Sequence, residues 1–115
     1  MLTEKYVKEF GERFAKDFLD ILLLRLIHRE PMWGYKIIKK VETLFNVKLR
    51  HGALYPLLNA LESNGFLTSK EEVRGRRVRK VYQITPKGTQ LVESYYDFLR
   101  EQLQMLNIRD QEIRR

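Results

Sequence analysis

The chain of 115 residues contains no cysteine. Disulfide bonds, iron–sulfur clusters, thiol catalysis and zinc sites with cysteine ligands are therefore excluded. Long hydrophobic runs are missing as well, because the longest, residues 18–27, is interrupted by Asp20 and Arg25 and is too short to span a bilayer. The first residues carry mixed charge, unlike a secretory signal. From these absences we expect a cytoplasmic protein with no membrane partner.

Catalytic and metal-binding patterns are also missing. The two histidines, His28 and His51, are far apart in the sequence and have no cluster of acids nearby. We find no glycine-rich phosphate loop, no paired carboxylates and no serine–histidine–aspartate order. We therefore predict no catalytic residue, no metal site and no cofactor, and we expect that the chain is not an enzyme.

Positive charge is abundant. The chain has 22 Lys and Arg against 15 Asp and Glu, which gives a formal net charge of +7. The hydrophobic fraction of 43% is typical of a folded globular domain, and the length fits one domain over residues 1–115. Such an excess of cations favours a polyanionic partner, of which nucleic acid is the commonest.

The spacing of apolar residues predicts three helices in the first half of the chain. A four-residue step that starts at Tyr6 predicts a first helix that ends at Pro31, with about residues 1–20 as an N-terminal extension. Two shorter helices are predicted for residues 35–44 and 52–63.

The apolar period then changes to two. Residues 66–73 and 78–84 alternate in the manner of strands around an arginine-rich turn, which predicts a β-hairpin. Thr85 followed by Pro86 is typical of a helix start. We predict a last helix over about residues 86–108.

The last helix carries an apolar seam with coiled-coil spacing. The seam consists of Val92, Tyr96, Leu99, Leu103 and Leu106. The helix would be roughly 33 Å long at 1.5 Å per residue, which exceeds what a small three-helix body can cover. We predict that the seam joins two chains in a homodimer. The alternative is that it packs only on its own domain.

The order of helix, helix, helix, β-hairpin and long helix is that of a winged helix-turn-helix domain. We therefore predict a mainly α fold with a small β-hairpin, an N-terminal helix and a long C-terminal dimerisation helix. In such domains the third helix enters the major groove of double-stranded DNA, and the hairpin, called the wing, reaches the flanking DNA.

The charge is concentrated where this fold would contact DNA. Residues 74–80 hold five cations and no acid, whereas the stretch from residue 81 onward has five of each sign. A solvated basic hairpin is the alternative. Clustering of like charges costs folding energy, however, so we expect the wing to contact phosphates or the minor groove.

The predicted DNA contacts combine these cations with residues of the second and third helices. His51, Tyr55 and Asn59 recur every four residues on one face of the third helix, although Tyr55 could be partly buried and Asn59 merely solvated. The start of the second helix offers free N–H groups to a phosphate, although the Tyr35 ring could belong to the core. The predicted contacts are Tyr35, Lys36, Lys48, Arg50, His51, Gly52, Tyr55, Asn59, Arg74, Arg76, Arg77, Arg79 and Lys80.

Several short motifs follow one another along the chain: Gly34-Tyr35-Lys36-Ile37, Gly52-Ala53-Leu54-Tyr55-Pro56-Leu57-Leu58, Leu61-Glu62, Gly65-Phe66-Leu67, Arg79-Lys80-Val81-Tyr82 and Ile84-Thr85-Pro86-Lys87-Gly88. Through these motifs the sequence resembles the PadR-type transcriptional regulators over roughly residues 22–106. Ala53 and Val81 depart from the family, which commonly has threonine and an aromatic residue there.

The resemblance implies a dimeric winged-helix repressor, joined through C-terminal helices. Because a dimer places two recognition helices on one face of DNA, we expect a near-palindromic operator. Several relatives respond to small aromatic or lipophilic effectors. A pocket for one could be lined by an aromatic stripe, which is otherwise simply core: Phe10, Phe14, Phe18, Tyr95, Tyr96 and Phe98. Two other functions fit the same fold, namely an architectural DNA binder without a preferred sequence and a module that docks an acidic protein.

Overall fold

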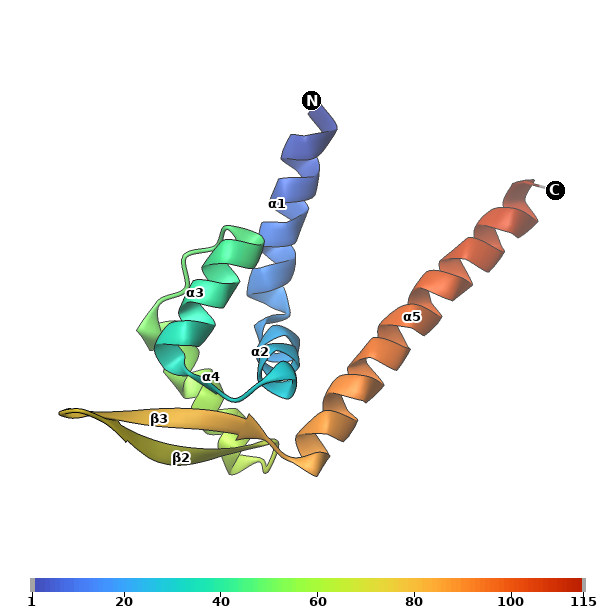
Figure 1. The fold of residues 1–115 in the computed structure, drawn as a ribbon. Helices are drawn as coiled ribbons and strands as arrows, with labels where there is room; N and C mark the ends of the chain where they lie inside the picture. Colours follow the sequence, from blue (N-terminus) through green and yellow to red (C-terminus); the bar gives the residue numbers. More distant parts are fainter. Residues whose placement is uncertain (1, 115) are drawn as a thin grey trace.

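The structure is a computed structural model that describes the backbone of residues 2–114 and the side chains of residues 2–106. Figure 1 shows a helical body from which a hairpin and a long helix project in different directions. In chain order the elements are α1 (Leu2–Asp17), α2 (Leu19–Arg29), β1 (Met32–Trp33), α3 (Gly34–Phe45), α4 (His51–Ser63), β2 (Leu67–Arg74), β3 (Arg77–Ile84) and α5 (Pro86–Arg114). The predicted mainly α winged helix-turn-helix fold is confirmed.

The sheet has one more strand than the sequence predicts. β1 pairs antiparallel with β3, with Met32 opposite Tyr82 and Trp33 opposite Val81, and the strand order is β1-β3-β2. Two residues are too few to show an alternating pattern, so this strand has no signal of its own in the sequence. Its effect is to join the segment before α3 to the root of the wing.

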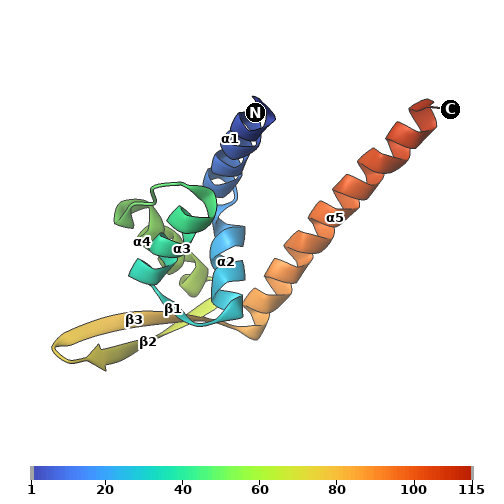
Figure 2. The same cartoon turned by 45° about the horizontal axis from the view of Figure 1, so that its top comes forward.

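The hairpin β2–β3 forms the wing. Its register runs from Leu67 opposite Ile84 at the root to Arg74 opposite Arg77 at the tip. Gly75 takes a positive φ of 62°, as the tight turn at the tip requires. The outer half stands free of the body, and its Val73 side chain is 72% exposed. Figure 2 shows the wing extending away from α5.

The predicted single helix up to Pro31 is wrong, because it is broken at Phe18, where φ is −117° and ψ is 36°. Hydrogen bonds from Phe18 N to Phe14 O and from Leu22 N to Phe18 O cross the break. α2 is buried along most of its length, whereas α1 buries only Ala15. The change of direction therefore lets α2 enter the core while α1 projects.

The last helix continues six residues beyond its predicted end, to Arg114. No glycine or proline follows Gly88, so the sequence contains no residue that would end the helix earlier. No helix among the described residues is long and apolar enough to cross a membrane. No group of three or more potential metal ligands occurs there either.

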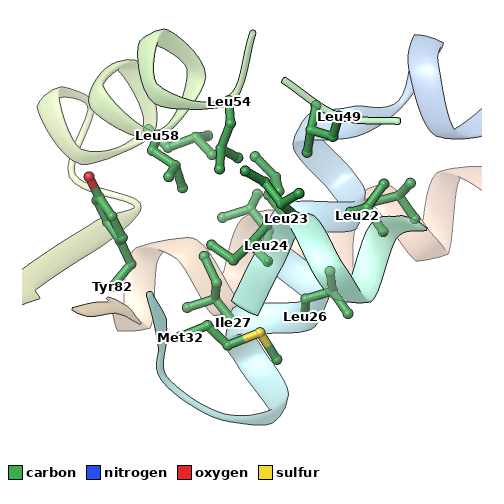
Figure 3. Close-up of a cluster of buried hydrophobic side chains, with 14 of the residues drawn as sticks. Leu22, Leu23, Leu24, Leu26, Ile27, Met32, Leu49, Leu54, Leu58 and Tyr82 are labelled. Atoms are coloured by element: carbon green, nitrogen blue, oxygen red, sulfur yellow. The ribbon is translucent and has the colours of Figure 1, made fainter. Parts of the chain in front are cut away.

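The core is centred on α2, and Figure 3 shows its side chains. Leu23 and Leu24 of α2 meet Leu54 and Leu58 of α4, while Tyr82 reaches from β3 toward α4. All five side chains are at most 1% exposed. The buried residues of the described part include no charged or polar side chain. Burial of apolar surface therefore positions α4 and the wing on one frame.

A polar cluster holds the start of α5 against the end of α4. The Thr85 hydroxyl accepts a hydrogen bond from Gly88 N (3.0 Å) and donates one to Gly65 O (2.7 Å). The first bond caps α5, which begins where Thr85 and Pro86 predict. Lys87 Nζ donates to Asn64 O at 2.7 Å. The direction in which α5 leaves the body is thus tied to the turn that follows α4.

We predict opposite effects for alanine at two helical glycines. A Cβ at Gly88 would collide with Phe66 O and lie 2.7 Å from Ile84 Cγ1, so Gly88→Ala should destabilise the fold by about 1–3 kcal/mol. Gly11 has open space around it, so Gly11→Ala should stabilise by roughly 0.5–1 kcal/mol through helix propensity. Urea unfolding at equal protein concentration measures both, and equal stability of the two variants would contradict the Gly88 contact.

Candidate nucleic-acid interface

Four elements meet around a cavity of about 330 Å³ beside the wing. Strand β1, the start of α3, the start of α4 and strand β3 each contribute aromatic or cationic side chains to it. The residues that line it are Trp33, Gly34, Tyr35, His51, Tyr55, Arg77, Val78, Arg79 and Lys80. Most of them are residues that the sequence assigns to DNA contact, so the fold brings together groups from three separate segments.

Tyr55 packs against the first residue of α3. A Cβ on Gly34 would overlap the Tyr55 hydroxyl and lie 2.9 Å from Cζ, so a larger residue there would require the Tyr55 ring to shift. His51 stacks on the same ring, with centroids 5.6 Å apart and planes 9° apart. Tyr55 nevertheless remains 37% exposed. It is therefore held firmly between two helices while part of its surface faces solvent.

Trp33 anchors a second aromatic group. Its ring lies 5.4 Å from that of Tyr35, centroid to centroid. On Trp33 rests the guanidinium of Arg79, with Cζ 3.9 Å from the ring centroid. Arg79 Nε is buried and has no hydrogen-bond partner among the described residues. Arg79 is thus already engaged with the body, although the sequence assigns it to DNA.

Glu62 ties the end of α4 to both strands of the wing. Its carboxylate accepts a hydrogen bond from Ser69 Oγ at 2.6 Å and lies 3.3 Å from Lys80 Nζ. The Ser69 hydroxyl and the Lys80 ammonium hold the pKa of Glu62 below its ordinary value. The same carboxylate raises the pKa of Lys80. Lys80 therefore supports the wing as well as carrying charge.

The remaining predicted cations differ in their availability. Lys36 pairs with Glu30 at 2.8 Å, an exposed pair that contributes little energy and is easily exchanged for a phosphate. Five others are exposed and have no ion pair or hydrogen bond from their side chains within the described part of the chain: Lys48, Arg50, Arg74, Arg76 and Arg77. Asn59 and Gly52 are also exposed on α4. The free positive charge thus lies at the wing tip and before α4.

The predicted dimer seam divides into two parts. Val92 is 1% exposed and packs in the core of its own protomer, so its assignment to the seam is corrected: α5 uses it to hold on to the body. Tyr96 packs on the same core, and Leu99 is half-buried. Leu103 and Leu106, further along α5, are 62% and 60% exposed. Only this outer part of the seam offers substantial free apolar surface.

Residues 23–94 match the sequence model of the PadR-like family of transcriptional regulators. The chain belongs to this family. It is 31% identical over 98 residues to the transcriptional regulator YqjI of Escherichia coli K12, covering 84% of this chain and 44% of that protein. It is 33% identical over 85 residues to the transcriptional activator GvpE of Haloferax mediterranei, covering 73% of this chain and 42% of that protein. The chain therefore spans less than half the length of these two relatives.

Solved structures of PadR-like proteins have the same fold. A PadR-like transcription factor from Bacteroides fragilis superposes with a TM-score of 0.75 at 25% identity, covering 86% of this chain and 96% of that one. A PadR family regulator from Eggerthella lenta gives 0.67 at 28% identity, covering 92% and 96%. The PadR-like fold thus includes the helical segment before the family match and the start of α5.

Sequence reasoning missed the residues that hold this interface together. Trp33, Gly34, Glu62 and Ser69 do not belong to a charge cluster or to a periodic stripe. Gly34 and Glu62 lie in motifs that carry the resemblance to the PadR-type regulators, but these motifs do not show what the two residues contact. Trp33 and Ser69 have no signal of their own in the sequence. Their partners lie in other elements, so only the fold reveals them.

We predict that Glu62→Gln lowers the free energy of unfolding by roughly 0.5–1 kcal/mol near neutral pH, because the amide loses the charge that Lys80 pairs with. In the folded protein the pKa of Glu62 is below the ordinary 4.5. The advantage of the wild type is therefore present above that value and is lost as pH falls through the lowered folded pKa.

Urea unfolding of both proteins over a pH series measures this difference. Glu93→Gln, at an exposed position of α5, is the matched control and should stay close to the wild type. A difference between Glu62→Gln and the wild type that does not change with pH would contradict the prediction.

Proposed function

We propose that this PadR-like chain is a sequence-specific regulator of transcription that binds double-stranded DNA as a homodimer. The observation that carries the proposal is the position of the free cations. Arg74, Arg76 and Arg77 project at the tip of the wing, while the exposed side chains at the start of α4 lie beside residues 77–80 of β3. This arrangement matches a helix in the major groove flanked by a basic wing.

The groups divide by role. Phosphates would be bound by the wing-tip arginines, by Lys48 and Arg50 before α4, and by Lys36 and Tyr35 at the start of α3, where free N–H groups add to the attraction. Bases would be read by His51, Tyr55 and Asn59 on α4, with Gly52 allowing a close backbone approach. Phosphate contacts supply most of the affinity, and base contacts supply the sequence preference.

The homodimer would form through the outer half of α5. Leu103 and Leu106 are exposed there, together with Phe98 and Met105. α1 also leaves large apolar side chains in solvent, such as Tyr6 and Phe10. A symmetric pair presents two α4 helices to one face of DNA, so the operator should be a near-palindrome.

Repression by covering a promoter is the output that we propose, and a small aromatic or lipophilic effector would relieve it. Within one protomer, Phe14 pairs with Phe18 and Phe45, while Tyr95 and Tyr96 pack against the core. Phe10 and Phe98 are exposed. An effector that touches all of the predicted aromatic residues would therefore need the partner chain to complete its site.

We expect a steep salt dependence of DNA binding that the wing cations supply. Binding is measured by titration with salt on two duplexes, one of mixed random sequence and one from the region upstream of the protein's own coding sequence. Arg76→Ala and Arg77→Ala should each weaken binding to both and flatten the log–log slope by about one unit per lost phosphate contact. Lys8→Ala on the exposed face of α1 is the control and should leave the slope unchanged.

The outcomes separate the rival functions. Binding to the upstream region that is about a hundredfold tighter than to random DNA supports a sequence-specific regulator. Equal binding to both contradicts sequence preference at that region and favours an architectural role. Absence of binding at moderate salt would favour a module that docks an acidic protein.

We expect the wild type to sediment as a dimer and Leu103→Asp to weaken the dimer by about a hundredfold or more, because the variant buries an unpaired carboxylate on each side of a two-fold contact. Gln104→Asp, at a neighbouring exposed position outside the seam, is the matched control. Analytical ultracentrifugation at micromolar concentration measures the effect. A dimer that persists in a folded Leu103→Asp variant would show that the contact lies elsewhere.

A further inference from the structure

We propose that Arg79 is a positioning residue for the DNA interface: stacked on Trp33, it fixes the direction of the wing relative to α3 and α4. The role in DNA binding rests on the proposed function, whereas the stacking itself is a property of the free protein. The sequence groups Arg79 with the other wing cations as a phosphate contact. In the structure, however, the surroundings of Arg79 differ from those of the other cations.

The sheet register brings Arg79 to Trp33. Trp33 pairs with Val81, so Arg79 lies two residues along β3 on the same face of the sheet. Diagonal neighbours of this kind are within reach of long side chains. The guanidinium carbon rests 3.9 Å from the centroid of the indole ring. Because β1 contains only Met32 and Trp33, this contact lies at the outer end of the pairing between β1 and the wing.

The burial of Arg79 supports a structural use of its guanidinium. Nε is covered and finds no hydrogen-bond acceptor among the described residues. A covered donor without a partner costs stability, so the contact with the ring must compensate for it. Arg74, Arg76 and Arg77, by contrast, are exposed, and their guanidinium groups form no hydrogen bond, ion pair or aromatic contact with other described residues. Arg79 therefore differs from the other three arginines in its burial and its contact, although all four lie within six residues of the chain.

Beyond Arg79 no hydrogen bond or ion pair between described residues ties the wing to the body. Only the pairs Val73–Val78 and Arg74–Arg77 follow it toward the tip, and Val78 is 62% exposed. On the other side of the wing root, Glu62 holds Ser69 and Lys80. Two contacts thus fix the direction of the hairpin, one to α4 through Glu62 and one to the start of α3 through Trp33.

The chemistry of the contact requires arginine. A planar guanidinium covers an aromatic face and remains charged, whereas a lysine ammonium keeps the charge but has no flat surface. If the stack holds the wing, its loss lets the tip cations move independently of α4. Binding must then order the wing, which lowers affinity without removing a phosphate contact.

The stacking can be tested without DNA, because Trp33 is the sole tryptophan of the chain. Arg79→Ala and Arg79→Lys uncover one face of the indole, so the acrylamide quenching constant of its fluorescence should rise roughly twofold. Arg77→Ala, two residues closer to the tip, should leave it at the wild-type value. Circular dichroism verifies that each variant is folded. Unchanged quenching in Arg79→Ala would overturn the proposal.

The positioning role is tested on the upstream-region duplex. We expect Arg79→Lys and Trp33→Leu each to weaken binding about tenfold with an unchanged salt slope, and the double variant to be no weaker than either alone. Arg25→Lys, which makes the same change at an exposed position of α2 outside the interface, should bind as the wild type does. If Arg79→Lys binds like the wild type, or the Trp33 and Arg79 effects add, Arg79 does not act through Trp33.

The two arms separate failure of this proposal from failure of the proposed function. A wild type that binds neither duplex, with quenching as expected, overturns the DNA-binding function and the positioning role that depends on it, and leaves the stack in place. Firm binding with unchanged quenching in Arg79→Ala overturns the Arg79 proposal alone.

Discussion

The structure depends on the burial of α2. This helix of 11 residues has six buried apolar side chains, and α1, α5 and β3 all contact it directly. A chain of this size can build only one core, so every functional element must reach that core to be held. α4 does so through Leu54 and Leu58, and the wing does so through Tyr82. The positions of α4 and the wing are therefore consequences of one apolar cluster.

The core alone does not settle where the wing points. A two-stranded ribbon rooted at one buried tyrosine can still twist and bend, and its outer half buries almost nothing. Polar and aromatic contacts restrict it: Glu62 with Ser69 and Lys80 on one side, and Arg79 with Trp33 on the other. Lys80 and Arg79 therefore use their charges in contacts within the protein, while the arginines at the tip remain exposed to solvent.

Much of the fold follows from the sequence because its signals are local. Periodicity identifies the helices, alternation identifies the hairpin, and Thr85 with Pro86 marks the start of α5. Features that depend on contacts with residues distant in the sequence cannot be predicted in this way. The break at Phe18 reflects where α2 meets the core, and β1 exists only because Met32 and Trp33 lie beside β3. The seam on α5 shows the same limit, since the heptad spacing does not distinguish Val92, which packs on its own body, from Leu103, which does not.

α5 connects the body that holds α4 with the apolar surface through which we propose that two chains meet. Its first turns are fixed to the end of α4 through Thr85, Lys87 and the close contact at Gly88, and Val92 fixes it to the core. Beyond these points the helix continues without a glycine or proline to bend it. If two chains meet along its outer half, the separation and tilt of the two α4 helices are set by the angle at which α5 leaves the body. Because that angle is fixed at the turn after α4, a change at such a dimer contact would be transmitted to α4, the helix proposed to face DNA, without passing through a flexible joint.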